Sequence, residues 1–237
     1  MSGLVIDQVS VARGGHTVVR EVSITAPLGE VTAILGPNGA GKSSLALGVA
    51  GLLRTTGGTV SIDGVDITHR RPDKVRAAGV SVVPEGRKLL PELSVADNLK
   101  VATYALSNDE SVGGIDYAMS LFPELETRYD QLGSTLSGGQ QQMLVLAQGL
   151  VSHPKVLLVD ELSLGLAPII IKRLVPTIES IAAAGVGVLL IEQFAHVALG
   201  LATTAYVMEG ARIRYSGTAQ ELSDNPDLLH SAYLLRT

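Results

Sequence analysis

A glycine-rich segment lies between two apolar runs, and this arrangement constrains the fold more than any other feature. Residues 36–43 read Gly-Pro-Asn-Gly-Ala-Gly-Lys-Ser, residues 31–35 form the apolar run before it, and residues 44–50 form the run after it. Glycines lack a Cβ, so the backbone can pass close to phosphate oxygens, and a helix N-terminus attracts anions. The sequence therefore predicts a buried strand, a phosphate-binding loop and a helix, in that order.

Several residues of this loop have predicted roles toward a nucleotide. Lys42 is expected to place its ammonium on the β- and γ-phosphates, Ser43 to ligate Mg²⁺, and Ser44 to bond the α-phosphate. The other residues predicted to contact the nucleotide are Gly36, Pro37, Asn38, Gly39, Ala40 and Gly41. The loop alone leaves the reaction open, because kinases, GTPases, motors and transport ATPases all use it.

A second anion site is predicted at a later helix. Residues 136–140 read Leu-Ser-Gly-Gly-Gln and precede an amphipathic run, with Ser137 as its predicted N-cap. Taken alone, such a turn is most often only a cap. Its position in the chain favours a functional role, in which the residues that face an anion are Ser137, Gly138, Gly139 and Gln140.

Two carboxylates follow a short apolar strand. Residues 156–159 predict the strand, and Asp160 and Glu161 come directly after it. In parallel sheets the carboxyl ends of strands meet at the edge where ligands bind, so both side chains are expected beside the phosphate loop. Asp160 suits magnesium, and Glu161 is placed to polarise an attacking water as general base.

These three motifs, in this order, resemble the ATP-binding cassette (ABC) family, the ATPase subunits of ABC transporters. The resemblance makes residues 36–43 the Walker A loop, residues 136–140 the signature motif and residues 156–161 the Walker B strand with a catalytic glutamate. It implies ATP and Mg²⁺ as cofactors. In the family, the signature of one subunit closes on the γ-phosphate held by another, so a lone subunit is expected to be nearly inactive.

The resemblance also implies the fold class and domain organisation. It predicts an α/β P-loop NTPase cassette with a mixed sheet core, an antiparallel β subdomain and an inserted α-helical subdomain at about residues 86–150. All of this is expected within a single domain, residues 1–237. The coarse pattern agrees. The strands expected for the antiparallel part are residues 4–11, 17–26 and 59–63, and those expected for the parallel sheet are residues 80–83, 156–159 and 186–191.

Three further segments are similar to the ATPase subunits of branched-chain amino-acid uptake systems. They are residues 83–87, 164–168 and 190–193. This resemblance implies a second, paralogous ATPase subunit, separate membrane permeases and, indirectly, a solute-binding protein. Residues 87–91 and the helix after them are the predicted groove for a permease helix. A urea- or amide-type uptake ATPase and a non-transport ABC-type switch remain alternatives, whereas a scaffold without hydrolysis is disfavoured by the catalytic residues present.

Two departures from the general ABC pattern affect the γ-phosphate region. Glu85 stands where most members carry a glutamine, and it is expected to join Ser43 and Asp160 as a ligand of the hard cation Mg²⁺. Gln193 stands at the switch position, where many members have histidine, and is the predicted γ-phosphate sensor in a catalytic role. His196 is interpreted as a helix-surface or core histidine.

Two other departures affect a loop and the base. Leu162 replaces a usual proline, which predicts more backbone freedom in residues 163–166, the segment that resembles the D-loop. Arg13 falls where an aromatic residue normally stacks on adenine. A guanidinium can stack on a purine face, a solvated loop arginine is equally compatible with the sequence, and His16 is a weaker alternative.

Composition limits the remaining function classes. The net charge of −5 and the lack of a dense Lys/Arg run argue against nucleic acid as a partner. The sequence has no cysteine, which excludes disulfides and thiolate ligands. No signal peptide is recognised at the N-terminus, and the most apolar stretches are broken by charged residues. We therefore expect a peripheral protein at the cytoplasmic face of the membrane, with a tail at residues 218–237 of short helices.

Overall fold

The computed structural model describes residues 2–225 and 227 of the 237-residue chain. The strands are β1 (Gly3–Arg13), β2 (His16–Pro27), β3 (Val31–Leu35), β4 (Thr55–Ile62), β5 (Val65–Asp66), β6 (Val80–Val83), β7 (Val156–Asp160), β8 (Gly187–Glu192), β9 (Thr204–Glu209) and β10 (Arg212–Thr218). The helices are α1 (Lys42–Val49), α2 (Pro72–Ala77), α3 (Val95–Ala102), α4 (Asn108–Leu121), α5 (Pro123–Glu126), α6 (Gly138–Leu150), α7 (Pro168–Ala183), α8 (Ala195–Leu201) and α9 (Ala219–Asp224).

A six-stranded sheet forms the centre of the molecule, with the order β10-β9-β3-β8-β7-β6. The pairs from β9 through β3, β8 and β7 to β6 are parallel, and β10 pairs antiparallel with β9. Every residue of β3, β7 and β8 is buried, because helices cover both faces of this sheet. The mixed sheet predicted from the sequence is confirmed. The loop after β3 and the carboxylates at the end of β7 therefore lie at the same edge of the sheet.

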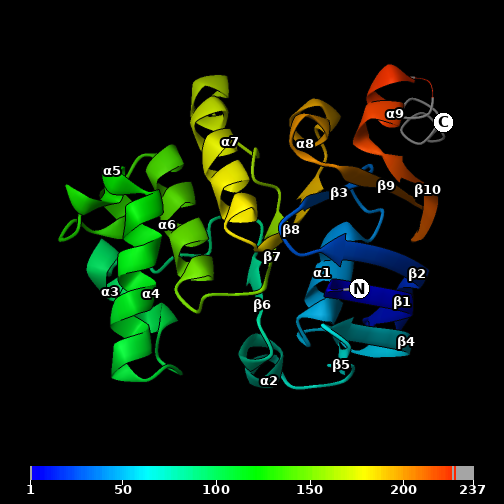
Figure 1. The fold of residues 1–237 in the computed structure, drawn as a ribbon, viewed down its shortest axis with the longest axis horizontal. Coiled ribbons are helices and arrows are strands. Elements are labelled where there is room, and N and C mark those ends of the chain that lie inside the picture. Colours follow the sequence, from blue (N-terminus) through cyan, green and yellow to red (C-terminus); the bar gives the residue numbers. More distant parts are fainter. Residues whose placement is uncertain (1, 226, 228–237) are drawn as a thin grey trace.

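A second, antiparallel sheet has the order β2-β1-β4-β5. Helix α1 lies between this sheet and the central one, as Figure 1 shows. Its Leu45 belongs to one buried cluster with Ile6 of the small sheet and Leu158 of the large one. This packing fixes the N-terminus of α1, and with it the phosphate loop, relative to both sheets.

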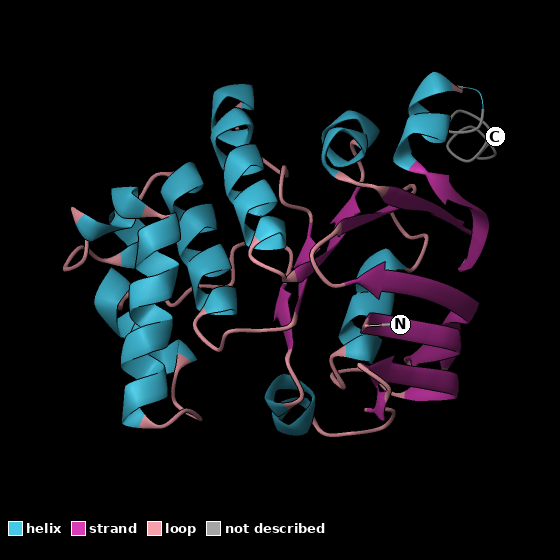
Figure 2. Cartoon of the chain, in the orientation of Figure 1, coloured by secondary structure: helices cyan, strands magenta, loops and turns pink. Residues whose placement is uncertain are grey.

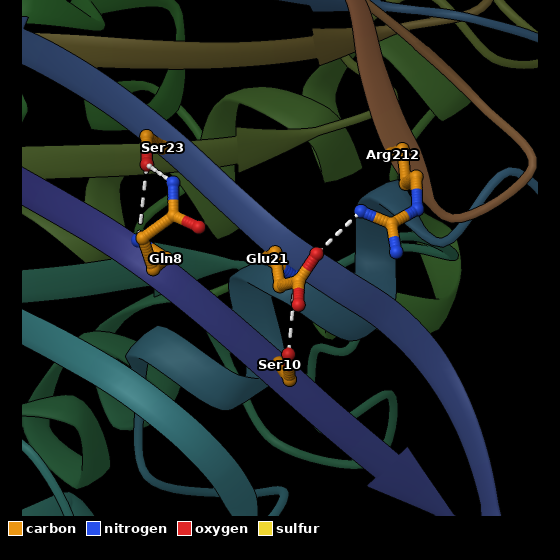
Figure 3. Close-up of polar contacts among 5 residues, drawn as sticks. All are labelled: Gln8, Ser10, Glu21, Ser23 and Arg212. Carbon is orange, nitrogen blue, oxygen red and sulfur yellow. Dashed lines mark hydrogen bonds and ion pairs between the residues drawn. The ribbon is translucent and has the colours of Figure 1, made fainter.

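Polar contacts also join the two sheets near their open edges (Figure 3). Arg212 of β10 forms a 2.6 Å ion pair with Glu21 of β2, and the backbone N–H of Glu21 donates to Ser10 Oγ of β1. Gln8 and Glu21 adopt left-handed backbone conformations where the β1–β2 register shifts. Such bulges bend and twist the strands, which lets the small sheet curve toward β10.

The helices α3 to α6 gather on one side of the molecule, away from the antiparallel sheet (Figure 2). Ser94 caps α3 by accepting a hydrogen bond from the backbone N–H of Asp97. Leu99 of α3 and Leu146 of α6 are fully buried in the core cluster that also covers one face of the central sheet. The assignment of residues 86–150 to a separate insertion stays a prediction.

Some elements were not expected from the sequence. The β9–β10 hairpin and the short helix α2 were missed. Helix α9 lies in the predicted helical tail, and the remainder of that prediction, at residues 226 and 228–237, falls outside the described residues. The longest described helix, α7, has 16 residues, and no helix in the described part of the chain is long and apolar enough to span a membrane.

Candidate nucleotide-binding and hydrolysis site

The glycines of the phosphate loop are required by the backbone around them. Gly36 has a φ of 152°, and a Cβ added there would lie 2.1 Å from the carbonyl oxygen of Met208 in β9. Gly41 has a φ of 106°, and its Cβ would lie 2.4 Å from the carbonyl oxygen of Val18 in β2. A side chain at either position would displace backbone. The loop is therefore wedged between the two sheets at the N-terminus of α1.

Lys42 is held inside this loop. Its Nζ donates to the carbonyl oxygens of Gly36, at 2.8 Å, and Pro37, at 3.1 Å. Burial lowers the pKa of Lys42, and the carboxylates of Glu161 and Asp160 oppose this effect. An ammonium has three N–H bonds, so two of them fix its position and the third remains for a phosphate oxygen.

Asp160 is a buried carboxylate with one unpaired oxygen. It is 5% exposed, and its Oδ1 has no hydrogen-bond partner among the described residues. Burial raises the pKa of Asp160, a hydrogen bond from Ser43 lowers it, and the nearby charge of Glu85 raises it further. A hydroxyl and a carboxylate are oxygen ligands of the kind that Mg²⁺ prefers. These residues therefore fit the predicted metal.

The rest of a metal coordination sphere has to come from elsewhere. In the described part of the chain, no group of three or more His, Cys, Asp or Glu side chains is arranged to hold a metal. Mg²⁺ in nucleotide sites is typically bound by one or two protein carboxylates together with phosphate oxygens and water. The sparse donor set formed by Ser43, Asp160 and Glu85 matches that pattern.

Glu161 follows directly in a strained conformation. Its φ is 53°, which is left-handed for a residue with a side chain, and its N–H donates to the carbonyl oxygen of Ile191 in β8. Such strain persists where the surrounding structure imposes it, often at functional sites. Burial raises the pKa of Glu161, and the charges of Glu85 and Asp160 raise it further. A raised pKa lies nearer to the pKa of an effective general base, which is close to the working pH.

A cavity of about 400 Å³ lies over the loop. It is lined by Arg13, Val18, Asn38, Gly39, Gly41, Lys42, Ser43, Ser44 and Glu85. The structure thus brings Arg13 and Glu85 to the loop residues. His16 pairs with Arg13 across the β1–β2 hairpin and is exposed, but it does not line this cavity. The position of Arg13 agrees with the stacking role predicted for it, which stays a prediction.

Gln193 follows the end of β8, and His196 is exposed on α8. The position of His196 matches the helix-surface interpretation. Glu192, the last residue of β8, is only 1% exposed. Burial raises the pKa of Glu192, and hydrogen bonds from Ser163 and from the backbone N–H of Gln193 lower it. Sequence reasoning gave Glu192 no role, although a carboxylate at the end of a fully apolar strand was a signal.

The signature residues lie apart from the nucleotide cavity of their own chain. Ser137 caps α6 through a reciprocal box: Gln140 N–H donates to Ser137 Oγ, and Ser137 N–H donates to Gln140 Oε1. The predicted cap is confirmed. None of residues 137–140 is among the described residues that line the 400 Å³ cavity. Within one chain, therefore, the two anion sites do not form a single site.

The segment after Glu161 differs from expectation. Leu162 predicted a freer backbone, but its side chain is fully buried in the core cluster. The next residue, Ser163, is anchored by two hydrogen bonds to Glu192, at 2.9 Å and 2.8 Å. The stiffness that a proline would give is replaced here by burial and by these bonds.

Comparison with known proteins decides among the P-loop families. Residues 19–163, more than half of the chain, match the ABC transporter family. The chain belongs to the ABC transporter family. It is an ATP-binding subunit with ATPase activity, and its fold is the P-loop ABC fold. Permease partners are implied for such a subunit, because ATP-binding proteins of transporters act on membrane components.

Three relatives show the breadth of this similarity. A high-affinity branched-chain amino acid transport ATP-binding protein, BraG of Pseudomonas aeruginosa, is 39% identical over 98% of this chain and 99% of its own length. A probable branched-chain amino acid transport ATP-binding protein, LivF of Archaeoglobus fulgidus, is 35% identical over 82% and 83%. The lipopolysaccharide export system ATP-binding protein LptB of Escherichia coli is 31% identical over 94% and 93%.

Solved structures are similar over nearly the whole chain. An ATP-binding cassette of an ABC transporter in its ADP conformation has a TM-score of 0.85 at 25% identity, covering 97% of this chain and 98% of that one. The ATP-binding subunit of another ABC transporter has a TM-score of 0.82 at 26% identity, covering 98% of each chain. The predicted fold class is therefore confirmed.

Proposed function

We propose that this chain hydrolyses ATP to energise an ABC importer, with branched-chain amino acids as the solute class. The observation that carries the hydrolytic role is the group of Lys42, Asp160 and Glu161 at one sheet edge, with the pKa of Glu161 raised. The solute class is supported by the relative from Pseudomonas aeruginosa, which is similar over almost the full length of both chains. No residue described here is proposed to touch the solute.

Each residue at the edge has a chemical task in this proposal. The third N–H of Lys42 binds a phosphate oxygen, and the Ser44 hydroxyl and loop N–H groups bind the others. Ser43, Asp160 and Glu85 hold Mg²⁺, which neutralises charge on the β- and γ-phosphates when bound. Glu161 orients and polarises the attacking water, and Gln193 donates a hydrogen bond to the γ-phosphate. Arg13 stacks on the adenine.

A second ATPase subunit completes the site in this proposal. The signature residues lie outside the cavity of their own chain, so a partner's residues 137–140, or their counterparts in a paralogue, close on the γ-phosphate. We propose a paralogous heterodimer, bound peripherally at the cytoplasmic face of the membrane. A solute-binding protein then acts on it only through the permeases.

A groove between α2, β6 and α6 is our proposed permease dock. It encloses about 270 Å³, and its lining includes Leu52, Lys88, Ala102 and Gln148. Leu52 is 57% exposed there, although large apolar side chains are usually covered. Lys88 lies in the segment that the sequence predicted for this role. Leu52→Asp is expected to reduce co-purification of permeases, while Val112→Asp, on exposed α4, leaves it unchanged.

The solute is tested by reconstitution. The tagged chain is purified in mild detergent with the membrane proteins that accompany it, and ATP hydrolysis is measured with and without leucine, isoleucine or valine and their binding protein. Stimulation supports the proposal. If urea or an amide stimulates the permease complex instead, the proposed solute class is wrong and is replaced by that one. If hydrolysis does not depend on a binding protein, the result favours an export system of the type named for the Escherichia coli relative. Purely soluble partners would favour a non-transport switch.

A further inference from the structure

The segment at residues 163–166 is fixed at its first residue by a buried carboxylate. Ser163 N–H donates to Glu192 Oε1 at 2.9 Å, and Ser163 Oγ–H donates to Glu192 Oε2 at 2.8 Å. Ser163 and Glu192 are 4% and 1% exposed. The backbone N–H of Gln193 donates to the same carboxylate. Charged acceptors in a buried setting make strong hydrogen bonds, so Ser163 and Gln193 are tied to one group.

The same segment is also held at its tip, by the side chain of Arg87. Arg87 Nη2 donates to the carbonyl oxygens of Gly165, at 3.0 Å, and Leu164, at 3.3 Å. These contacts join residues 77 and 78 positions apart in the sequence. A guanidinium presents its donors in a rigid fork, so it can hold two neighbouring carbonyls in a way that a lysine ammonium does not.

Arg87 also lies against the signature motif. A Cβ added to Gly138 would be 2.8 Å from Arg87 Nη1 and 3.2 Å from its Cζ, so the guanidinium covers this glycine. The backbone directs the side chain there, because Gly86 and Arg87 are both left-handed, with φ of 85° and 49°. Glu85, which lines the nucleotide cavity, directly precedes this turn. Arg87 therefore connects three separate motifs of one chain.

We propose that Arg87 and Glu192 are positioning residues that clamp residues 163–166 between the Glu85 loop, the first turn of the signature helix and Gln193. The functional part of this inference rests on the proposed function, because the clamp can affect turnover only if two cassettes pair to hydrolyse ATP. A displacement of Gln193 by the γ-phosphate moves Ser163 through Glu192. A displacement of the Glu85 loop moves Leu164, Gly165 and Gly138 through Arg87.

The clamp itself is tested on the purified chain without nucleotide, by hydrogen–deuterium exchange read by mass spectrometry. The reporting amides are Leu164 N–H, which donates to Glu161 O, and Leu166 N–H, which donates to Ser163 O. Arg87→Ala is expected to speed exchange of the peptide covering residues 162–167 about tenfold, as loss of a charged hydrogen bond predicts. Lys172→Ala, which removes an exposed cation on α7, is the matched control and leaves this exchange unchanged. Equal exchange in Arg87→Ala and the unsubstituted chain overturns the proposal.

The other half of the clamp has a conservative variant. Glu192→Gln keeps an oxygen to accept from Ser163 N–H and an amide to donate to Ser163 Oγ, so it is expected to preserve protection of the same peptide. Glu192→Ala is expected to speed exchange of this peptide about tenfold. Loss of protection in both, or in neither, contradicts the role of Glu192. If Glu192→Ala does not fold, Ser163→Ala takes its place: it removes the Oγ–H donor to Glu192 Oε2 and is expected to speed exchange of this peptide, and unchanged exchange contradicts the role of Glu192.

Turnover separates a positioning role from a general structural one. Because Arg87 does not line the nucleotide cavity, Arg87→Ala is expected to bind a fluorescent ATP analogue within twofold of the unsubstituted chain. In the permease complex its kcat is expected to fall about tenfold while KM for ATP stays unchanged. An unchanged kcat overturns the functional part of the clamp. If the permease complex with the unsubstituted chain fails to hydrolyse ATP, the proposed function fails, whereas the exchange result stands independently of it.

Discussion

The ammonium of Lys42 lies 2.8 Å from the carbonyl oxygen of Gly36, inside the loop that it is expected to serve. The bond fixes Nζ before any nucleotide arrives, so little side-chain entropy remains to be lost on binding. Burial lowers the pKa of Lys42, while Glu161 and Asp160 favour its charged form. The loop therefore holds a positioned ammonium among carboxylates. An incoming triphosphate can neutralise the charge of this ammonium.

Removal of this cation is expected to weaken nucleotide binding. Lys42→Ala should raise the Kd for ATP by about 100-fold, because charge-assisted hydrogen bonds to phosphate contribute roughly 2–3 kcal/mol. Titration with a fluorescent ATP analogue measures the change. Lys155→Ala removes a cation that pairs with Asp63 and does not line the nucleotide cavity, and it should leave the Kd unchanged. An unaltered Kd in Lys42→Ala would contradict the placement of the phosphates.

Replacing Glu161 by Gln is expected to separate binding from hydrolysis. The amide is isosteric but cannot accept a proton, so kcat should fall by about 100-fold or more while ATP affinity is retained. Steady-state phosphate release by the permease complex gives kcat, and the same fluorescence titration gives the affinity. Glu179→Gln, on the exposed side of α7, is the control and should hydrolyse ATP like the unsubstituted chain. Turnover at the unsubstituted rate in Glu161→Gln would disprove the general-base assignment.

The buried Glu192 predicts a pH-dependent stability difference. Burial raises its pKa above the ordinary value of 4.5, so the folded chain binds this proton more tightly than the unfolded chain does. As pH rises above 4.5, the unfolded chain ionises more readily than the folded one, and the chain loses stability until the folded pKa is passed. Glu192→Gln carries no such charge. It should therefore be more stable than the unsubstituted chain at pH 7, by roughly 1 kcal/mol, and should lose this advantage below about pH 4.

Urea unfolding at several pH values, without nucleotide or Mg²⁺, checks this difference. Glu126→Gln, at an exposed position of α5, should show no comparable pH-dependent gain. A stability advantage of Glu192→Gln that grew toward acidic pH would have the wrong sign for a raised pKa.

The sequence predicted the central strands and the phosphate loop because their signals are local. Continuous apolar runs such as residues 156–159 need no distant information to be read as buried strands. The β9–β10 hairpin was missed because its turn holds Gly210 and Ala211, both with positive φ. Alanine is an unusual residue for such a turn, where asparagine or glycine is the familiar signal. Strand β10 also has no fully buried residue and therefore lacks a continuous apolar run.

The contacts around residues 163–166 could not be read from the sequence, because each joins distant segments. Glu192 and Ser163 are 29 positions apart, and Arg87 and Gly165 are 78 apart. Neither spacing carries a local pattern. The motif residues, by contrast, were located by their order and by the strand or helix that precedes or follows each one. Leu162 shows the limit of single-residue reasoning: its intrinsic freedom is overridden by burial and by the anchored Ser163 beside it.

Asn98 holds the segment before α3 against the signature helix, and its loss is expected to destabilise the helical side of the molecule. It is fully buried, its Oδ1 accepts from Leu90 N–H at 2.8 Å, and its Nδ2 donates to carbonyls that include Leu90 O at 2.9 Å. Gln148 of α6 donates to Asn98 O at 3.1 Å and to Asn98 Oδ1 at 3.3 Å. Alanine would remove the acceptor of Leu90 N–H and one of the two donors to Leu90 O, to which Leu93 N–H also donates.

Asn98→Ala should therefore lower the free energy of unfolding by about 2 kcal/mol, since it removes several side-chain hydrogen bonds that contribute about 0.5–1.5 kcal/mol each. Urea unfolding monitored by circular dichroism gives the value. Asn108→Ala, at the exposed first turn of α4, should change it by less than about 0.5 kcal/mol. Gln148→Ala removes only the contacts to Asn98. The loss of stability in Asn98→Ala should therefore exceed that in Gln148→Ala. Equal stability of Asn98→Ala and the unsubstituted chain would mean that water replaces these bonds.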